Sequence, residues 1–219
     1  MTLPLCHSER VKRDEESWHF RYCEDPLTPL RSAQDDRGAC LKGNAMKIAI
    51  IGYSGSGKST LARCLADEYQ LPVLHFDTVQ FRPNWEIRPQ ESKEIMTKVF
   101  LDIHTDWVID GNYSKLFFER RMEESDVIVL TLFNRLSCLY RVWRRYRKYK
   151  NKTRPDMGEG CKEKLDWEFI TWVLWKGRSK SARQRYRGVL EQYPEKTIVI
   201  KNQRQLNGVQ KRIEKLHLK

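Results

Sequence analysis

Short apolar runs alternate with longer amphipathic segments along residues 46–205. The apolar runs predict buried parallel strands at 47–51, 73–76, 107–109, 127–133 and 197–200. Apolar positions at helical spacing between them predict helices at 58–70, 89–104, 114–124, 136–150 and 161–176, a further helix from the break at Gly177 to Tyr193, and a terminal helix from about 205. Strands that alternate with helices at this interval imply right-handed crossovers, so we expect a three-layer α/β fold with a parallel sheet.

Two of these helices carry distinctive apolar residues. Ile95, Val99 and Ile103 share one face of the helix at 89–104. Four aromatic residues recur at helical spacing in the helix at 161–176 and are expected to pack it against the core: Trp167, Phe169, Trp172 and Trp175.

Residues 1–45 show no such periodicity. They hold seven basic and eight acidic residues, so the net positive charge lies entirely after residue 45. A strand begins abruptly after Met46, and the preceding phrases resemble translated intergenic repeats of bacterial genomes. We hypothesise that the protein starts at Met46; the alternative is a disordered or regulatory arm.

The formal net charge of +12 in 219 residues favours a polyanionic partner: a nucleotide, a nucleic acid or an anionic membrane surface. No apolar run approaches the length of a membrane span, and the N-terminus lacks a secretory signal, so we expect a cytoplasmic protein. The six cysteines form no C-x-x-C pair, which argues against a zinc site. Cys64 and Cys138 lie among apolar neighbours and are expected in the core.

One glycine-rich motif follows the first strand directly. Gly52-Tyr-Ser54-Gly55-Ser56-Gly57-Lys58-Ser59-Thr60 fits the G-x-x-x-x-G-K-[ST] pattern of a phosphate-binding P-loop, between a strand and a helix as the motif requires. The glycines let the backbone approach phosphate oxygens, and successive N–H groups point at the anion. We expect ATP here, with Lys58 at the β- and γ-phosphates, Ser59 on Mg²⁺ and Thr60 near the α-phosphate.

Beyond this loop the sequence resembles the adenylate kinase and shikimate kinase branch of P-loop proteins. It more closely resembles a bacterial adenylate-kinase-related family usually labelled "DNA topology modulation protein". The matching segments are 52–60, 74–77, 107–113, 133–138, 154–169 and 201–203. The resemblance covers nearly all of 46–205 and none of 1–45, and it implies a nucleoside/shikimate kinase-like fold with a helical lid at about 136–185.

The resemblance implies roles for two carboxylates at strand ends. Asp110, in Val-Ile-Asp-Gly, would hold Mg²⁺ through water as a Walker B residue; the alternative is an Asp that caps a turn. Asp77 would orient or deprotonate an acceptor hydroxyl; the alternative is a loop Asp near a helix start. His75 is expected to be a packed strand residue. Adenylate kinases continue with an aromatic residue, Pro and Arg after Asp-Gly, where this chain has Asn112-Tyr113, which argues against a simple AMP kinase.

The resemblance also suggests binding residues on both sides of the site. Arg82, Trp85 and Arg88 lie in the substrate-recognition segment, where the Trp can stack a base and an Arg can pair a phosphate; a core Trp between solvated charges is the alternative. Lys201-Asn202-Gln203 matches the loop that packs on adenine.

A strongly basic segment runs from Arg141 to Arg154, with eight basic and no acidic residues. Arg141 and Arg145 share a helix face and resemble lid arginines that stabilise the transferred phosphoryl group, to which Arg154 can add. Aromatic residues alternate with these charges, so a nucleic-acid surface and an ordinary solvated lid surface stay open as alternatives.

Three functions are compatible with these features. In the first, an enzyme transfers the γ-phosphate of Mg-ATP to a small nucleotide-like or hydroxylated acceptor near Asp77. In the second, ATP switches a nucleic-acid-binding protein that grips DNA through 141–154. The third is a slow NTPase.

Overall fold

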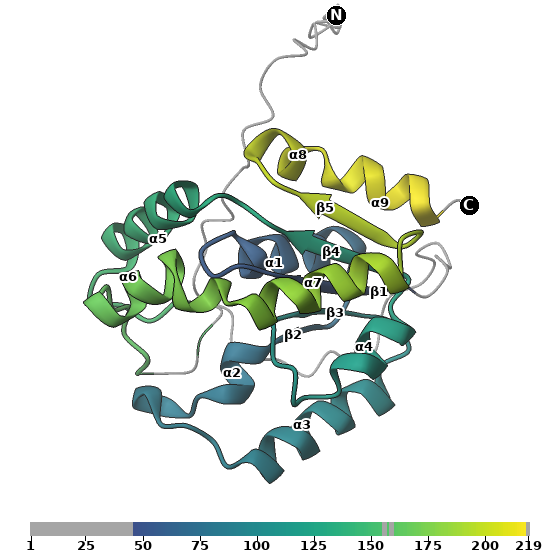
Figure 1. The fold of residues 1–219 in the computed structure, drawn as a ribbon. Coiled ribbons are helices and arrows are strands. Elements are labelled where there is room, and N and C mark those ends of the chain that lie inside the picture. The colour runs from purple at the N-terminus through teal and green to yellow at the C-terminus, as the bar shows by residue number, and fades with distance from the viewer. Residues whose placement is uncertain (1–45, 155–156, 158–159, 218–219) are drawn as a thin grey trace, which may run out of the picture. The chain divides into compact units, whose positions relative to one another are not determined.

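Five parallel strands form one sheet in the order β2-β3-β1-β4-β5 (Figure 1). The strands are β1 (Lys47–Gly52), β2 (Val73–His75), β3 (Trp107–Asp110), β4 (Val127–Thr131) and β5 (Thr197–Ile200). The structure, a computed structural model, describes residues 46–154, 157 and 160–217. The hypothesis about residues 1–45 therefore concerns a part of the chain outside this description.

Helices connect the strands. They are α1 (Lys58–Tyr69), α2 (Phe76–Gln80), α3 (Gln90–Ile103), α4 (Phe118–Glu124), α5 (Arg135–Tyr149), α6 (Trp167–Leu174), α7 (Lys180–Gln192), α8 (Gln203–Asn207) and α9 (Val209–His217), with the 3₁₀ turns η1 (Pro83–Trp85) and η2 (Lys176–Arg178). Because β1 pairs in parallel with β3 on one side and β4 on the other, the chain reverses its direction of winding at β1. Ligands of open α/β sheets bind at this kind of position.

The two faces of the sheet bury separate cores. Along β1, Ile48 and Ile50 point to one face and pack with residues of α1, α5 and α9. Ala49 and Ile51 point to the other face and pack with residues of α2, α3, α4 and α7. This alternation is the two-residue period of a strand that is buried on both sides. The three-layer α/β fold expected from the sequence is confirmed (Figure 1).

Several predicted boundaries are wrong, among them the end of the fourth strand, which lies at Thr131 and not at 133. The second strand ends at His75, and Phe76 instead begins α2. The helix predicted at 114–124 begins only at Phe118. The helix predicted at 161–176 is limited to α6, where the Asp166 side chain accepts a hydrogen bond of 2.8 Å from the Phe169 amide and caps the N-terminus. The segment before Asp166 pairs with residues 150–153 through isolated bridges, and this long-range pairing replaces the local helix.

Two apolar faces noted in the sequence lie at the surface. Ile95, Val99 and Ile103 of α3 are 56%, 48% and 68% exposed. The prediction that the aromatic residues near α6 pack against the core is wrong for three of them, because these remain about half exposed or more: Trp167, Trp172 and Trp175. Phe169 alone packs against the core. Cys138 is buried as predicted, whereas Cys64 is only partly buried.

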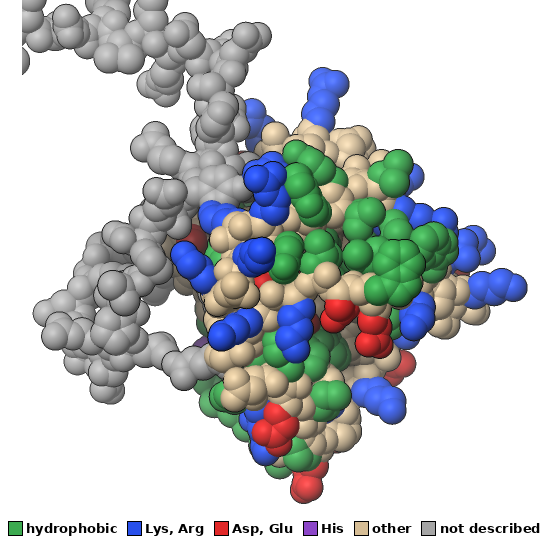
Figure 2. Space-filling model, turned by 90° about the vertical axis from the view of Figure 1, so that its left-hand side faces the viewer, with side chains coloured by type: hydrophobic (Ala, Val, Ile, Leu, Met, Phe, Trp, Pro, Cys, Tyr) green, Lys and Arg blue, Asp and Glu red, His purple; other side chains and the backbone are tan. Residues whose placement is uncertain are grey.

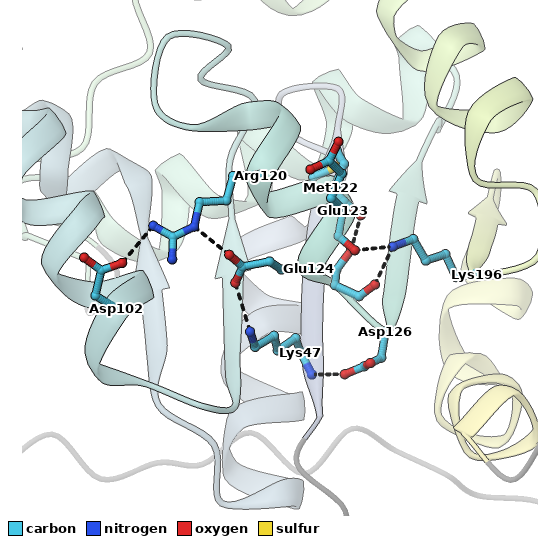
Figure 3. Close-up of polar contacts among 9 residues, drawn as sticks. Lys47, Asp102, Arg120, Met122, Glu123, Glu124, Asp126 and Lys196 are labelled. Atoms are coloured by element: carbon cyan, nitrogen blue, oxygen red, sulfur yellow. Dashed lines mark hydrogen bonds and ion pairs between the residues drawn. The ribbon is translucent and has the colours of Figure 1, made fainter.

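Ion pairs lie at the amino-terminal end of the strands, opposite the phosphate loop (Figure 3). The Lys47 ammonium lies 2.9 Å from Glu124, and the Lys47 amide donates to Asp126 at 2.7 Å. Arg120 connects Glu124 to Asp102 of α3, with nitrogen–oxygen distances of 2.5 and 2.8 Å. These contacts join β1, α3 and α4.

Candidate active site

The phosphate loop joins β1 to α1 and is held by β4 and α5. The Tyr53 amide donates to the Thr131 carbonyl at 3.1 Å, and the Ser56 hydroxyl lies 2.7 Å from the Thr131 hydroxyl. Gly55 has a φ of +77°, and a Cβ there would lie 2.7 Å from Val142 of α5. Only glycine fits this approach, so the loop packs directly against α5 at Gly55.

Lys58 lies at the centre of the site. Its ammonium donates to the Tyr53 carbonyl at 3.0 Å. Desolvation lowers the pKa of Lys58, although the charges of Asp110 and Asp77 oppose this effect. Asp110 is the last residue of β3, and Asp77 lies in the first turn of α2, two residues after the end of β2, so the charges of both carboxylates act on the loop lysine.

Asp110 is the carboxylate closest to the loop. The Ser59 hydroxyl donates to its Oδ2 atom at 2.8 Å. The Nδ1 atom of His75 lies 2.5 Å from the other oxygen, Oδ1. Asp110 is 5% exposed and is paired in register with His75 across β2 and β3. Hydroxyl and carboxylate oxygens are ligands that Mg²⁺ accepts, directly or through water, so this pair fits a magnesium-bound nucleotide.

Asp77 lies in the first turn of α2 and is paired with Tyr113. The Tyr113 hydroxyl donates to Asp77 Oδ1 at 2.9 Å. Burial, and then the charge of Asp77, raise the pKa of the Tyr113 phenol, so it stays protonated and keeps donating at neutral pH. The Asp77 carboxylate is therefore oriented by a fixed donor.

Asn112 holds the start of the loop. Its Oδ1 atom accepts from the Gly52 amide at 2.8 Å, and its side-chain nitrogen donates to the Gly52 carbonyl. Asn112 and Tyr113 are therefore part of the site, whereas the sequence marked them only as a departure from the adenylate kinase pattern. The clue was their position two and three residues after the third strand.

Arg141 of α5 reaches back to the loop. Its Nη1 atom donates to the Ser56 carbonyl at 2.7 Å, and Nη2 donates to Gln203 Oε1. The guanidinium lies 4.0 Å from the centre of the Phe133 ring. These contacts connect α5, the phosphate loop and the predicted adenine loop at Gln203. The neighbouring Asn202 uses its side chain to cap α8 by accepting from the Gln205 amide.

Arg145 and Arg154 share one buried carboxylate. Arg145 donates through Nε to Glu163 Oε1 at 2.7 Å, and Arg154 Nε lies 2.7 Å from Glu163 Oε2. The Glu163 side chain is 2% exposed. The positive charge of Arg145 also lowers the pKa of Lys58, after the larger effect of desolvation. Sequence reasoning missed Glu163, because nothing local marks a carboxylate that pairs with arginines nine and eighteen residues earlier.

The predicted substrate-recognition segment lies against the chain around Glu163. Trp85 donates through Nε1 to the Lys162 carbonyl at 3.1 Å, and its ring meets Phe81 edge-on. Arg82 pairs with Glu86 at 3.3 Å. Arg88 donates to the Val79 carbonyl at 3.0 Å.

Three loop positions complete the set of predicted residues. Ser54 accepts a hydrogen bond of 3.0 Å from Trp172 Nε1, so α6 contacts the phosphate loop directly. Thr60 is exposed on the first turn of α1. Gly57 has a φ of +94° and directly precedes α1.

Comparison with known proteins gives matches only among solved structures. No family model matches the chain, and a search of curated proteins finds no match. A shikimate kinase from Acinetobacter baumannii, solved in complex with shikimate, is 15% identical with a TM-score of 0.44, and the match covers 80% of this chain and 94% of the other. A shikimate kinase from Bacteroides thetaiotaomicron is 14% identical with the same TM-score, covering 78% and 97%.

An uncharacterized protein from Eubacterium ventriosum is also similar, at 15% identity and a TM-score of 0.44, with 77% of this chain and 98% of that one covered. At this level of likeness, the assignment of the fold depends on the chain's own features. The strand order, the parallel pairing and the loop between β1 and α1 define an α/β fold with the strand–loop–helix unit of P-loop proteins. Among the described residues, none of the helices has the length and apolar character needed to cross a bilayer.

Proposed function

We propose that the chain is an ATP-dependent phosphotransferase whose acceptor is a small nucleotide-like or hydroxylated molecule. The observation that carries the proposal is the meeting of Lys58, Asp110 and Asp77 at one end of the sheet, with the Ser59 hydroxyl 2.8 Å from Asp110. Phosphoryl transfer needs mainly positioning and charge stabilisation, and these side chains supply both.

The loop residues fit a triphosphate and Mg²⁺. A Cβ at Gly55 would fill the space that the backbone uses to pack against α5. The side-chain nitrogen of Lys58 donates to the Tyr53 backbone carbonyl. An anion that reaches Lys58 would replace this carbonyl with a charged acceptor, which is a stronger interaction. When bound, Mg-ATP supplies the γ-phosphoryl group and the metal offsets its charge; Ser59 and Asp110 would hold the metal.

Asp77 is the proposed residue on the acceptor side. Tyr113 occupies its Oδ1 atom, so the carboxylate is oriented with Oδ2 as the oxygen that can accept the proton of an acceptor hydroxyl. Arg82, Trp85 and Arg88 follow on the next segment and are proposed to recognise the rest of the acceptor. Adenine is proposed to pack near Asn202 and Gln203.

Arg141 and Arg145 are proposed to stabilise the charge of the transferred group. Arg141 already contacts the loop at Ser56, and Arg145 is close enough to Lys58 to affect its pKa. Arg154 reaches the same region through Glu163. Guanidinium groups that are positioned in advance stabilise developing charge without the cost of reorganisation.

An acceptor screen tests this function. ADP release from Mg-ATP is measured with a panel of nucleoside monophosphates and small alcohols, for the wild type and for Asp77→Asn. We expect one class of acceptor to accelerate ADP release in the wild type and to have little effect in the variant. A steady release that no acceptor changes would contradict the proposal and leave a slow NTPase.

A second candidate function is binding of single-stranded nucleic acid, which the outward face of α5 favours. Tyr140 and Trp143 are 57% and 42% exposed, and Arg147 lies 4.9 Å from the centre of the Trp143 ring. Figure 2 views the molecule from the side on which α5 and α6 lie, and Lys and Arg side chains surround hydrophobic ones on this face. Bases stack on exposed aromatic rings while cations bind phosphates.

Salt dependence tests this second function. Anisotropy of a labelled oligonucleotide is recorded over a range of salt concentrations for the wild type, Trp143→Ala and Lys58→Met. We expect affinity that falls steeply with salt, weakens in Trp143→Ala and survives Lys58→Met. Equal affinity of wild type and Trp143→Ala would exclude this surface. The proposed compartment for either function is the cytoplasm.

A further inference from the structure

His75 contacts the carboxylate that faces the phosphate loop. Its Nδ1 atom lies 2.5 Å from Asp110 Oδ1, and Asp110 Oδ2 accepts from the Ser59 hydroxyl at 2.8 Å. The three side chains therefore form a chain in which one carboxylate uses one oxygen for each neighbour. A carboxylate oxygen accepts, so we assign this contact with His75 donating through Nδ1–H.

The backbone sets this contact. His75 is the last residue of β2, and Asp110 is the last residue of β3 and its partner in register. Side chains of residues paired in adjacent strands point to the same face of a sheet. His75 and Asp110 are 9% and 5% exposed, so neither changes orientation without breaking buried contacts. Asp110 is thus fixed with Oδ2 toward the loop.

We propose that His75 is a positioning residue for the magnesium-bound nucleotide, an inference that rests on the function proposed above. Its Nδ1–H fixes the Asp110 carboxylate so that Oδ2 faces Ser59, the residue with which Asp110 would hold the metal. Without this donor, the carboxylate rotates or loses its buried partner, and Ser59 and Asp110 no longer present their oxygens together. Outer contacts of this kind orient metal-binding groups and contribute strongly to metal affinity.

The alternative is that His75 only fills space in the strand. The two roles differ in what they predict for substitutions. An apolar residue of similar size preserves packing and removes the donor, as in His75→Leu. Asn places an amide N–H at the position of the imidazole Nδ1, so His75→Asn preserves the donor with less volume. A positioning role predicts that Asn is tolerated better than Leu in nucleotide binding.

Calorimetry measures this difference without a turnover assay. The Kd of ATP is measured in excess Mg²⁺ and in EDTA, and the ratio of the two values is the magnesium gain of each variant. In EDTA we expect similar affinities, because the loop amides and Lys58 are unchanged. We expect the magnesium gain to fall by roughly tenfold in His75→Leu and to be largely retained in His75→Asn.

Each outcome separates the two proposals. A wild type without any magnesium gain contradicts the proposed function itself. A clear gain in the wild type that is equal in His75→Leu overturns the role of His75 and leaves the function standing, as does loss of the gain in both variants alike. If His75→Leu does not fold, His75→Gln replaces it: its amide lies one methylene further out, so it is polar but misplaced, and an undiminished gain there also overturns the inference.

Discussion

The residues that distinguish this site from the adenylate kinase pattern are Asn112 and Tyr113. Asn112 pairs with both backbone groups of Gly52, and Tyr113 donates to Asp77. Two neighbouring residues after β3 therefore hold the loop on one side and the Asp77 carboxylate on the other. Their function depends on contacts 36 and 60 residues apart in the chain.

Replacement of Tyr113 by Phe removes only the hydroxyl that donates to Asp77. The ring still packs beside Phe76, so we expect the fold to persist. Loss of a hydrogen bond to a charged group is expected to lower kcat by about tenfold with little change in the Kd of Mg-ATP. Steady-state kinetics with the acceptor found in the screen measure this. Tyr69→Phe is the matched control, because the Tyr69 hydroxyl has no hydrogen-bond partner among the described residues. Equal kcat in both variants would contradict the role of Tyr113.

At the scale of elements, the strand and loop pattern was predictable and the segment after α5 was not. Buried strands and the glycine-rich turn have local signatures, and these placed Lys58 correctly at the start of α1 and Asp110 at the end of β3. The chain around Glu163 looked helical because aromatic residues recur at helical spacing. Its actual conformation depends on Arg145 of α5 and on Trp85, and these partners are remote in sequence.

Alanine substitutions at two glycines, Gly52 at the end of β1 and Gly188 in α7, are expected to have opposite effects on stability. Gly52 has a φ of +141°, and a Cβ there would lie 2.2 Å from the Thr131 carbonyl oxygen. Gly188 lies inside α7, where a Cβ meets nothing within 4 Å among the described residues. We expect Gly52→Ala to reduce the free energy of unfolding by about 2 kcal/mol and Gly188→Ala to increase it by about 0.5 kcal/mol. Urea unfolding measures both, and a stable Gly52→Ala would show that the loop can shift.

At the scale of the whole molecule, the two ends of the parallel strands differ: ion pairs lie at the amino-terminal end, and the candidate site lies at the carboxyl-terminal end. Ion pairs connect β1, α3 and α4 at the amino-terminal end of the strands (Figure 3), while the phosphate loop, Asp77 and Asp110 lie at the opposite end. Alternation of strands and helices predicted this division, because parallel strands bring all their carboxyl ends together. Which side chains meet at the carboxyl-terminal end depends on the register and order of the strands, and the sequence pattern alone does not give these.

The ion pairs of Glu124 with Lys47 and Arg120 predict that the free energy of unfolding depends on pH. Burial tends to raise the pKa of Glu124, but hydrogen bonds from Lys47 and Arg120 outweigh it and lower this pKa below its ordinary value of 4.5. The stabilisation is therefore present above about pH 4.5 and is lost as pH falls through the lowered value. At pH 7 we expect Lys47→Met to reduce the free energy of unfolding by about 0.5 kcal/mol, and near pH 3 to have little effect. Chemical unfolding at both pH values measures this, and a deficit that is independent of pH would contradict it.

The central claim is that the loop between β1 and α1 binds the phosphates of a magnesium nucleotide through its amides and Lys58. Calorimetry of ATP in Mg²⁺ tests it most directly, with the wild type, Lys58→Met and Gly188→Ala side by side. We predict binding by the wild type and Gly188→Ala, and a Kd at least about tenfold weaker in Lys58→Met. A wild type without measurable affinity for ATP, or a Lys58→Met variant that binds equally well, would contradict the account.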